Sequence, residues 1–322
     1  MHFYMNIHNF HACRHILSGR TPAKREEDKS MNGMFFGTGT AIVTPFYKGK
    51  VDLDAFERLL KRQMQAHADA MIVCGTTGEA SALTHQEKND LVSLAKEICK
   101  GKVPVIAGAG ANSTSVAIDQ AKAMEKAGAD AILCVTPYYN LANQTGLKQH
   151  FTSVADAVSI PLILYNVPSR TGVSLEAETA AELFKHPLIP AVKEAATDFS
   201  KAERMTRLSL DGAYVYSGND AMTLSLMAMG ACGVISVVSN AAPKEMKNLT
   251  HACLNGDMEK AQRAHADLTP LMDLMKLDIN PIPIKAVLSV MGLIQNELRL
   301  PLTPISNENM KKIEAVLKKL PL

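Results

Sequence analysis

The chain has 322 residues, 47% of them hydrophobic and 20% charged, which provides a sizeable core for one large or two ordinary domains. Lysine and arginine number 34 against 32 acidic residues, and the net charge of +2 argues against non-specific nucleic-acid binding. No apolar run approaches the roughly eighteen residues needed to span a membrane, so we expect the protein to bind neither nucleic acid nor membranes.

Residues 1–33 differ in composition from the rest of the chain. They hold four of the ten histidines and a charged run from Lys24 to Lys29, without apolar periodicity. They lack the apolar segment of a secretory signal, and the acidic residues of the charged run are unlike a transit peptide. We interpret residues 1–33 as a disordered leader, or as a start assigned too early, and expect residues 1–30 to be dispensable.

From Thr38 onward, short apolar runs alternate with longer amphipathic segments. The expected strands are residues 40–43, 70–74, 103–107, 131–135, 162–165, 189–193, 213–217 and 233–237. The expected helices between and after them are residues 53–67, 85–100, 113–127, 145–158, 175–185, 199–210, 221–229 and 243–255. Further helices are expected at residues 258–277, 283–291 and 307–320.

The expected strands are apolar on both faces, as a buried parallel sheet requires. Eight strand–helix units in this length fit an α/β fold of the (β/α)8 TIM-barrel type, which typically takes about 250 residues. A doubly wound open sheet is the alternative on periodicity alone. We expect the barrel to span residues 34–256 and a C-terminal helical extension to span residues 257–322.

Polar residues follow the expected strands at one end. G-T-T-G-E occupies positions 75–79, T-P-Y-Y-N positions 136–140, Y-N-V-P-S-R-T-G positions 165–172 and S-G-N-D positions 217–220. Chemistry in a (β/α)8 barrel takes place at the carboxyl ends of the strands. These segments are therefore expected to form one site.

Lys193 ends the apolar run at 189–193. Lysine is rarely buried unless it is paired or functional, and removal from water disfavours its charged form. A neutral lysine amine can condense with a ketone to give a Schiff base. The alternative is a surface lysine just past the strand, paired with Glu194.

No cofactor or metal motif is complete. Gly108-Ala109-Gly110 lacks the third glycine of a dinucleotide fingerprint, and the G-T-T-G segment lacks the lysine of a phosphate loop. Histidines after residue 33 show no ligand spacing, so we expect neither metal nor cofactor. The six cysteines are scattered without a C-x-x-C pair, which indicates a reducing, cytoplasmic setting.

Four motifs together carry a resemblance to a known family: G-T-T-G-E at 75–79, P-Y-Y-N at 137–140, Y-N-V-P-S-R-T-G at 165–172 and V-K-E-A at 192–195. In this order and spacing they resemble the Schiff-base aldolases related to N-acetylneuraminate lyase, and within them the dihydrodipicolinate synthases. The resemblance covers the chain from about residue 34 onward. It implies a (β/α)8 barrel, usually a homotetramer built as a dimer of dimers, that works in lysine and diaminopimelate synthesis.

The resemblance also implies the substrates and the catalytic residues. Lys193 would form an imine with pyruvate, and the resulting enamine would attack L-aspartate-4-semialdehyde. Tyr165, Thr76 and Tyr139 match the family's proton relay, in which the residue aligned with Tyr139 reaches across a subunit interface. Hydroxyls suit such a relay because each can donate and accept.

Other positions match the family's substrate-binding residues. The backbone N–H groups of Thr76 and Thr77 would hold the pyruvate carboxylate at a strand-to-helix turn. Arg170 would hold the carboxylate of the semialdehyde through paired hydrogen bonds. Gly218 and Ile235 match positions that line the site.

Many members of the family are inhibited by lysine, and the residues aligned with that regulatory cleft are His85, Lys88, Asn112, Val116 and Tyr138. Lys88 stands where a histidine is expected, and Val116 stands where a glutamate is expected. Both changes disfavour a cationic ligand, so we expect little or no inhibition by lysine.

Two alternatives to the semialdehyde-using enzyme stay open. A sialic-acid or keto-deoxy-sugar-acid lyase would use the same lysine with pyruvate, although Thr76-Thr77 and Arg170 disfavour it. A barrel without catalytic activity could act as a pyruvate sensor or a scaffold. Trapping of a pyruvate adduct with borohydride separates that sensor from an enzyme.

Overall fold

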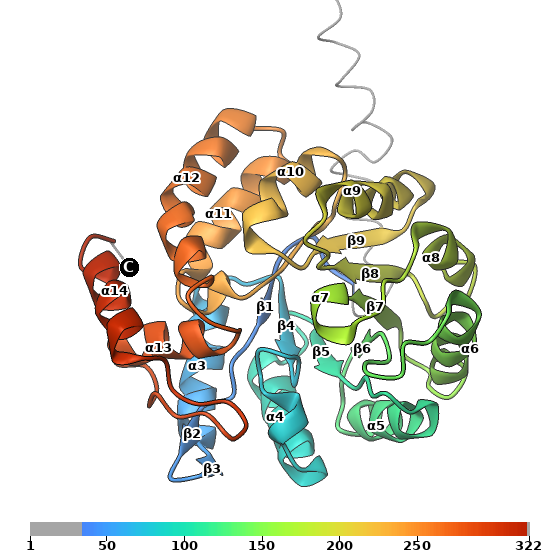
Figure 1. Ribbon diagram of the computed structural model, residues 1–322, viewed down its shortest axis with the longest axis horizontal. Helices are drawn as coiled ribbons and strands as arrows, with labels where there is room; N and C mark the ends of the chain where they lie inside the picture. The colour runs from blue at the N-terminus through green and yellow to red at the C-terminus, as the bar shows by residue number, and fades with distance from the viewer. Residues whose placement is uncertain (1–33, 321–322) are drawn as a thin grey trace, which may run out of the picture.

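The computed structural model describes residues 34–320, so the leader expected at residues 1–33 lies outside the described residues. Eight parallel strands of the described part close into a barrel in the order β1-β10-β9-β8-β7-β6-β5-β4 (Figure 1). The strands are β1 (Gly37–Ala41), β4 (Ala70–Val73), β5 (Val105–Gly108), β6 (Ala131–Val135), β7 (Leu162–Asn166), β8 (Ala191–Glu194), β9 (Tyr214–Ser217) and β10 (Gly233–Ser236). The pairing of β1 with β4 closes the ring, which confirms the (β/α)8 barrel and excludes the open sheet.

Helices cover the outside of the barrel, one or more after each strand. They are α3 (Leu53–Gln65), α4 (His85–Cys99), α5 (Thr114–Lys126), α6 (Gln144–Ala155), α8 (Ala177–Leu183), α9 (Phe199–Arg207), α10 (Thr223–Ala228) and α11 (Pro243–Leu254). Three further helices form the C-terminal extension: α12 (Met258–Leu274), α13 (Ile282–Val290) and α14 (Asn307–Leu317). Within the described residues, none of the helices has the length and apolar character needed to cross a membrane.

The strands are apolar on both faces because two separate layers use them. Ile163 and Tyr165 on β7 belong to a cluster inside the barrel, whereas Leu162 and Leu164 belong to the larger cluster between strands and helices. Side chains on a strand alternate between its two faces, so each strand contributes to both layers. This arrangement is typical of a parallel barrel whose strands are fully covered.

Three short elements were not predicted from the sequence: β2 (Phe46–Tyr47), β3 (Lys50–Val51) and α7 (Pro168–Thr171). The first two form an antiparallel hairpin whose turn residues, Lys48 and Gly49, both have positive φ. The third is a single helical turn that starts at a proline. Elements of two to four residues are too short to show a period.

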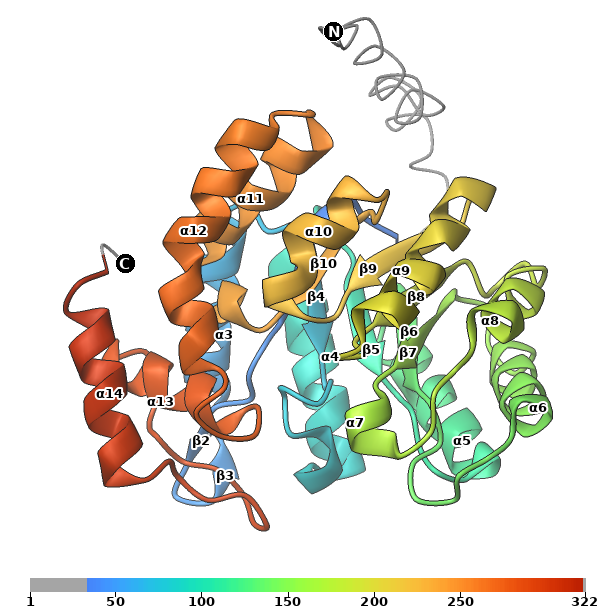
Figure 2. The same ribbon diagram turned by 45° about the horizontal axis from the view of Figure 1, so that its top comes forward.

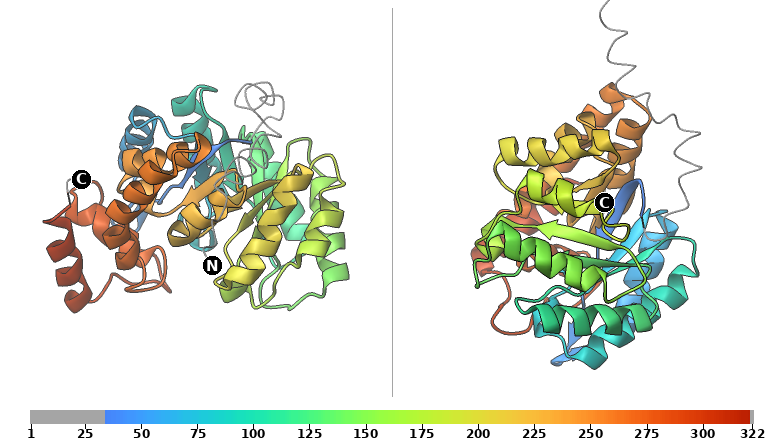
Figure 3. Two further views of the ribbon diagram at one scale, coloured as in Figure 1. Left: turned by 90° about the horizontal axis from the view of Figure 1, so that it is seen from above. Right: turned by 90° about the vertical axis from the view of Figure 1, so that its right-hand side faces the viewer.

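The C-terminal extension reaches two regions of the barrel surface. α12 packs along α11 in antiparallel fashion, while α13 lies on the side of α3 and the β2–β3 hairpin and α14 packs against α12 and α13 (Figures 2 and 3). The segments before and after α13 return to the carboxyl ends of the strands, where Asn280 and Arg299 contact loops of the barrel. The extension therefore contributes residues to the end of the barrel that holds the predicted site.

Candidate functional site

Lys193 lies within β8, and the residue as a whole is 5% exposed. Parallel pairing places it beside Tyr165 of β7 and Tyr216 of β9. Its Nζ atom is 4.3 Å from the centre of the Tyr165 ring. Ala191, two residues earlier, belongs to the interior cluster, and alternation puts Lys193 on the same face. Lys193 is therefore a residue of the barrel interior and not a surface lysine.

Glu194 points to the opposite face and has its own partners. Its carboxylate accepts hydrogen bonds from the Asn166 side chain at 2.8 Å and from the Ala196 N–H at 2.6 Å. Burial raises the pKa of Glu194, and these hydrogen bonds oppose the shift. Among the described residues, no ion pair joins Glu194 to Lys193, so the alternative of a surface pair is wrong.

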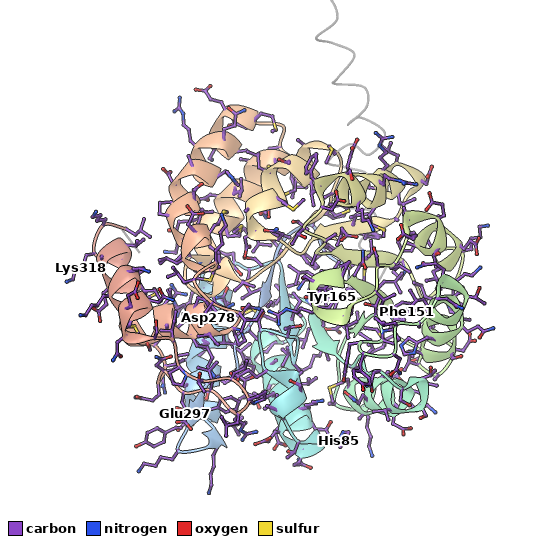
Figure 4. All side chains as sticks on the ribbon, in the orientation of Figure 1. His85, Phe151, Tyr165, Asp278, Glu297 and Lys318 are labelled. Atoms are coloured by element: carbon purple, nitrogen blue, oxygen red, sulfur yellow. The ribbon has the colours of Figure 1, made fainter. Side chains whose placement is uncertain are left out.

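A cavity of about 430 Å³ opens at the carboxyl ends of the strands. Thr76, Tyr165 and Arg170 line it, together with Lys88 and Tyr138. Figure 4 shows Tyr165 near the middle of the barrel, at the place where Figure 1 labels α7. Because the Tyr165 ring both contacts the Lys193 ammonium and lines the cavity, it joins the buried lysine to the space where substrates would bind.

The turn at residues 75–79 follows β4 and closes on itself through hydrogen bonds from Gly78 N–H to Gly75 and from Glu79 N–H to Thr76. Within the described residues, the backbone N–H groups of Thr76 and Thr77 donate no hydrogen bond to the protein. Two adjacent free N–H groups in a turn are suited to bind an anion. The arrangement supports the predicted carboxylate site at this turn.

The turn is anchored by the C-terminal extension. Glu79 is buried with φ of +53°, and its carboxylate lies 2.6 Å from Lys285 Nζ on α13. Its other carboxylate oxygen accepts the Arg299 N–H at 3.1 Å. Lys285 is fully buried, and it also donates to the Thr44 carbonyl at 2.9 Å. The turn therefore has its conformation fixed by residues more than 200 positions away in sequence.

Arg299 has a second acidic partner outside the turn. Its guanidinium pairs with Glu87 at 2.6 Å and lies 4.5 Å from the centre of the Phe46 ring. The hydrogen bond from Arg299 lowers the pKa of Glu87 to about 2. The segment after α13 is thus joined to α4 as well as to the turn at 75–79.

Arg170 lies on α7 at the mouth of the cavity, with an exposed side chain. Its Nη2 donates to the Asn280 carbonyl at 2.9 Å. The Asn280 side chain in turn donates to Thr77 Oγ1 at 3.0 Å. Asn280 therefore connects the two residues that the resemblance assigns to the two substrate carboxylates.

Tyr139 does not line the cavity of its own chain. It is 87% exposed, and its φ of +74° is uncommon for a residue other than glycine. Strained backbone that is kept in a structure is often found at functional sites. Its predicted place in the relay requires a second copy of the chain and stays a prediction.

Of the five residues aligned with the regulatory cleft, two line the cavity. Lys88 and Tyr138 line the cavity, whereas His85, the first residue of α4, and Val116 on α5 are exposed. Asn112 accepts a hydrogen bond from the Asn140 side chain through its carbonyl.

Lys88 itself is only 8% exposed, and its ammonium lies 3.2 Å from Gln120 Oε1. Burial lowers the pKa of Lys88. A buried cation with a neutral acceptor therefore stands where the resemblance expects a histidine.

Gly218 and Ile235 do not line the cavity. The Gly218 N–H donates to the Glu194 carbonyl at 2.6 Å, and a Cβ atom there would lie 2.6 Å from the Ala195 Cβ. This close approach of β8 and β9 explains the glycine. Ile235 on β10 is fully buried in the interior cluster that contains Tyr165.

No sequence motif predicted roles for the anchoring residues Glu79, Asn280, Lys285 and Arg299. Of these, Glu79 alone belongs to the G-T-T-G-E motif. A buried position for Lys285 could have been suspected from the apolar residues around it in α13. Among the described residues, no group of three or more His, Cys, Asp and Glu side chains is placed to hold a metal ion.

Residues 34–320 match the Dihydrodipicolinate synthetase family. The chain is 46% identical over 289 residues to the 4-hydroxy-tetrahydrodipicolinate synthase of Thermotoga neapolitana. This alignment covers 88% of this chain and 98% of that protein. The crystal structure of dihydrodipicolinate synthase from Thermotoga maritima has a TM-score of 0.86 and 44% identity, over 89% of this chain and 98% of the other. A crystal structure of the dihydrodipicolinate synthase of Acinetobacter baumannii complexed with pyruvate has a TM-score of 0.86 and 40% identity. The match covers 88% of this chain and 98% of the other.

Proposed function

Because the chain belongs to the Dihydrodipicolinate synthetase family, we propose that it condenses pyruvate with L-aspartate-4-semialdehyde to give 4-hydroxy-tetrahydrodipicolinate. This is the first committed step of lysine and diaminopimelate biosynthesis, and the enzyme is a class I, Schiff-base lyase. The observation that carries the proposal is Lys193, a lysine inside the barrel whose ammonium contacts a cavity-lining tyrosine.

The chemistry follows from a lysine amine beside hydroxyl groups. Lys193 attacks the ketone carbon of pyruvate, and loss of water from the carbinolamine gives an imine. The imine acidifies the pyruvate methyl group, so loss of a proton gives an enamine, which attacks the aldehyde carbon of the semialdehyde. The amino group of the adduct then attacks the imine carbon, closes the ring and releases Lys193.

Each of these steps moves a proton, and the proposed relay supplies the groups. Tyr165 lies against Lys193 and faces the cavity, and Thr76 lines the same cavity. Each hydroxyl can accept a proton from one neighbour and donate one to another. Gly218 and Ile235 remain proposed as substrate-binding positions: Gly218 directly follows β9, the neighbour of β8, and Ile235 lies on β10, the next strand.

We expect Arg170→Ala to leave adduct formation with pyruvate intact and to impair use of the semialdehyde. The variant removes a charged hydrogen-bond donor at the cavity mouth but leaves Lys193 and the turn at 75–79 in place. Loss of such a bond is worth roughly 1.5–3 kcal/mol, or about 10- to 150-fold in kcat/KM for the semialdehyde. Steady-state kinetics with each substrate varied in turn measure this effect.

Arg204→Ala is the matched control for Arg170→Ala. Arg204 is an exposed arginine on α9 that pairs with Glu178, away from the cavity. If Arg170→Ala reduced adduct formation with pyruvate as severely as removal of Lys193, the role assigned to Arg170 would be wrong. Activity with a sugar aldehyde in preference to the semialdehyde would instead favour the sugar-acid lyase.

We also propose that the enzyme is insensitive or only weakly sensitive to lysine. Val116 offers no charge to a ligand ammonium, and the buried Lys88 would repel a cation that entered beside it. We expect half-inhibition by lysine no lower than about 1 mM, which corresponds to roughly −4 kcal/mol of binding. Activity titrated against lysine provides the measurement.

The same titration is repeated with the double variant Lys88→His and Val116→Glu. It restores the two side chains that the regulatory pattern contains, and it is expected to bind lysine more tightly than the wild type. Strong inhibition of the wild type itself, well below that concentration, would contradict the proposed insensitivity.

We propose a homotetramer, arranged as a dimer of dimers, in which Tyr139 of a neighbouring subunit completes the relay. Its exposed side chain and strained backbone support this assignment, because neither is explained within one chain. Sedimentation equilibrium measures the mass of the assembly, and an active monomer would contradict the proposed tetramer.

The free cysteines of the described chain support our proposal that the enzyme works in the cytoplasm.

A further inference from the structure

We propose that Asn280 recognises the amino group of the second substrate, and so selects an amino-acid aldehyde over the same aldehyde without the amino group. The inference rests on the proposed function and deepens it. It assigns a specificity-determining role to a residue of the C-terminal extension, in the segment between α12 and α13.

Asn280 is held at the cavity wall by two hydrogen bonds. Its backbone carbonyl accepts from Arg170 Nη2 at 2.9 Å, and its side-chain N–H donates to Thr77 Oγ1 at 3.0 Å. Asn280 and Arg170 both line the cavity. The side chain therefore lies between the residue proposed to bind the semialdehyde carboxylate and the turn proposed to bind pyruvate.

The remaining polar atom of the side chain, Asn280 Oδ1, is buried and has no hydrogen-bond partner among the described residues. An amide oxygen can accept two hydrogen bonds, and leaving a buried acceptor unpaired costs free energy. A buried unpaired acceptor in a cavity wall is thus suited to a donor on a bound molecule.

The proposed substrates differ in the donors that they bring. Pyruvate carries none, whereas aspartate semialdehyde carries an amino group on the carbon next to its carboxylate. If Arg170 holds that carboxylate, the amino group lies one bond further on, near the residue that Arg170 itself contacts. Asn280 Oδ1 is then an acceptor at the position where this donor needs one.

The charges around the cavity favour an amide for this task. Of the described residues that line the cavity, Glu79 is the one carboxylate, and it already pairs with Lys285 and the Arg299 N–H. A free carboxylate beside the amino group would stabilise its protonated form. The amine must lose that proton before it can close the ring, and a neutral oxygen accepts from either form.

The test compares two aldehydes, aspartate semialdehyde and succinic semialdehyde, which lacks the amino group. Succinic semialdehyde lacks the amine that releases Lys193, so a single turnover is measured: the second-order rate constant for the reaction of each aldehyde with the pyruvate-loaded enzyme. We expect Asn280→Leu to lower the value for aspartate semialdehyde by about 10- to 150-fold, and to change the value for succinic semialdehyde much less. The ratio is the readout, because loss of the bond to Thr77 affects both aldehydes alike.

Asn280→Asp provides the second variant and fixes which atom faces the substrate. An aspartate keeps an oxygen at the position of Oδ1, so preference for the amino aldehyde should be retained. A loss of preference equal to that of Asn280→Leu would mean that the nitrogen faces the substrate, and would overturn the inference. Asn296→Leu is the matched control, since Asn296 also has a buried, unpaired Oδ1 but does not line the cavity.

The outcomes separate this inference from the proposed function. Absence of a borohydride-trapped pyruvate adduct in the wild-type enzyme would reject the proposed function itself. An adduct that forms normally, with an unchanged aldehyde ratio in Asn280→Leu, would reject the role of Asn280 alone. Thermal unfolding of each variant shows whether it is folded. If the leucine variant does not fold, the aldehyde ratio of the aspartate variant decides the role of Asn280.

Discussion

Lys193→Ala is expected to abolish the adduct that borohydride traps from pyruvate, and to lower kcat by roughly 10⁴-fold or more, as removal of a covalent nucleophile does elsewhere. The reason is chemical: without the amine no imine forms, and the pyruvate methyl group is not acidified. Mass spectrometry of the reduced protein measures the adduct, and peptide mapping locates it. The same variant should keep its fold, because Lys193 forms no ion pair within the described chain.

Lys88→Met is the discriminating control, since Lys88 lines the cavity directly, whereas Lys193 lies behind the cavity-lining Tyr165. We expect this variant to retain the adduct, because Lys88 is paired with Gln120 and lies on α4 rather than beside Tyr165. An adduct that persisted in Lys193→Ala and vanished in Lys88→Met would transfer the nucleophile to Lys88 and refute the assignment.

Lys285→Met is expected to destabilise the protein by about 3–5 kcal/mol, the usual cost of removing one partner of a buried ion pair. The substitution leaves the Glu79 carboxylate uncompensated at a site where both side chains are at most 1% exposed. It also removes the hydrogen bond to the Thr44 carbonyl. The midpoint and slope of urea unfolding give the change in free energy, provided that the transition is reversible.

Two comparisons show whether the pair itself causes this effect. The double variant Glu79→Gln and Lys285→Met removes both charges and should be less destabilised than Lys285→Met alone. Lys276→Met removes an exposed lysine of the same extension, which pairs with Asp273 on the surface, and should leave stability nearly unchanged. Equal stability of Lys285→Met and Lys276→Met would show that the buried pair contributes nothing.

The barrel could be predicted from the sequence because its strands and helices are each encoded locally. The strand expected at 131–135 is observed at Ala131–Val135, and the others differ by a few residues at their ends. Apolar runs that are buried on both faces, followed by amphipathic segments, leave few alternatives. The hairpin at Phe46–Val51 could not be predicted in this way, because its strands have two residues each.

The site could be predicted only in part, for a related reason. Thr76, Tyr165, Arg170 and Lys193 follow or end apolar runs, so the barrel itself places them at one end. The anchors of the turn come from far away in the chain: 206 positions separate Glu79 from Lys285, and 203 separate Thr77 from Asn280. Contacts over such distances produce no periodic pattern.

The anchoring of the turn at 75–79 by the C-terminal extension bears on protein synthesis. Translation makes the barrel strands first, and β10 ends at Ser236, before Asn280, Lys285 and Arg299 have been added. Domains fold as units while the chain emerges, so a nascent barrel can hold Lys193 and Tyr165 without a fixed carboxylate-binding turn. A ribosome-bound or prematurely terminated chain would therefore carry the nucleophile without the means to orient a keto acid. The turn proposed to bind the pyruvate carboxylate therefore gains its last anchoring contact only when Arg299 has been added.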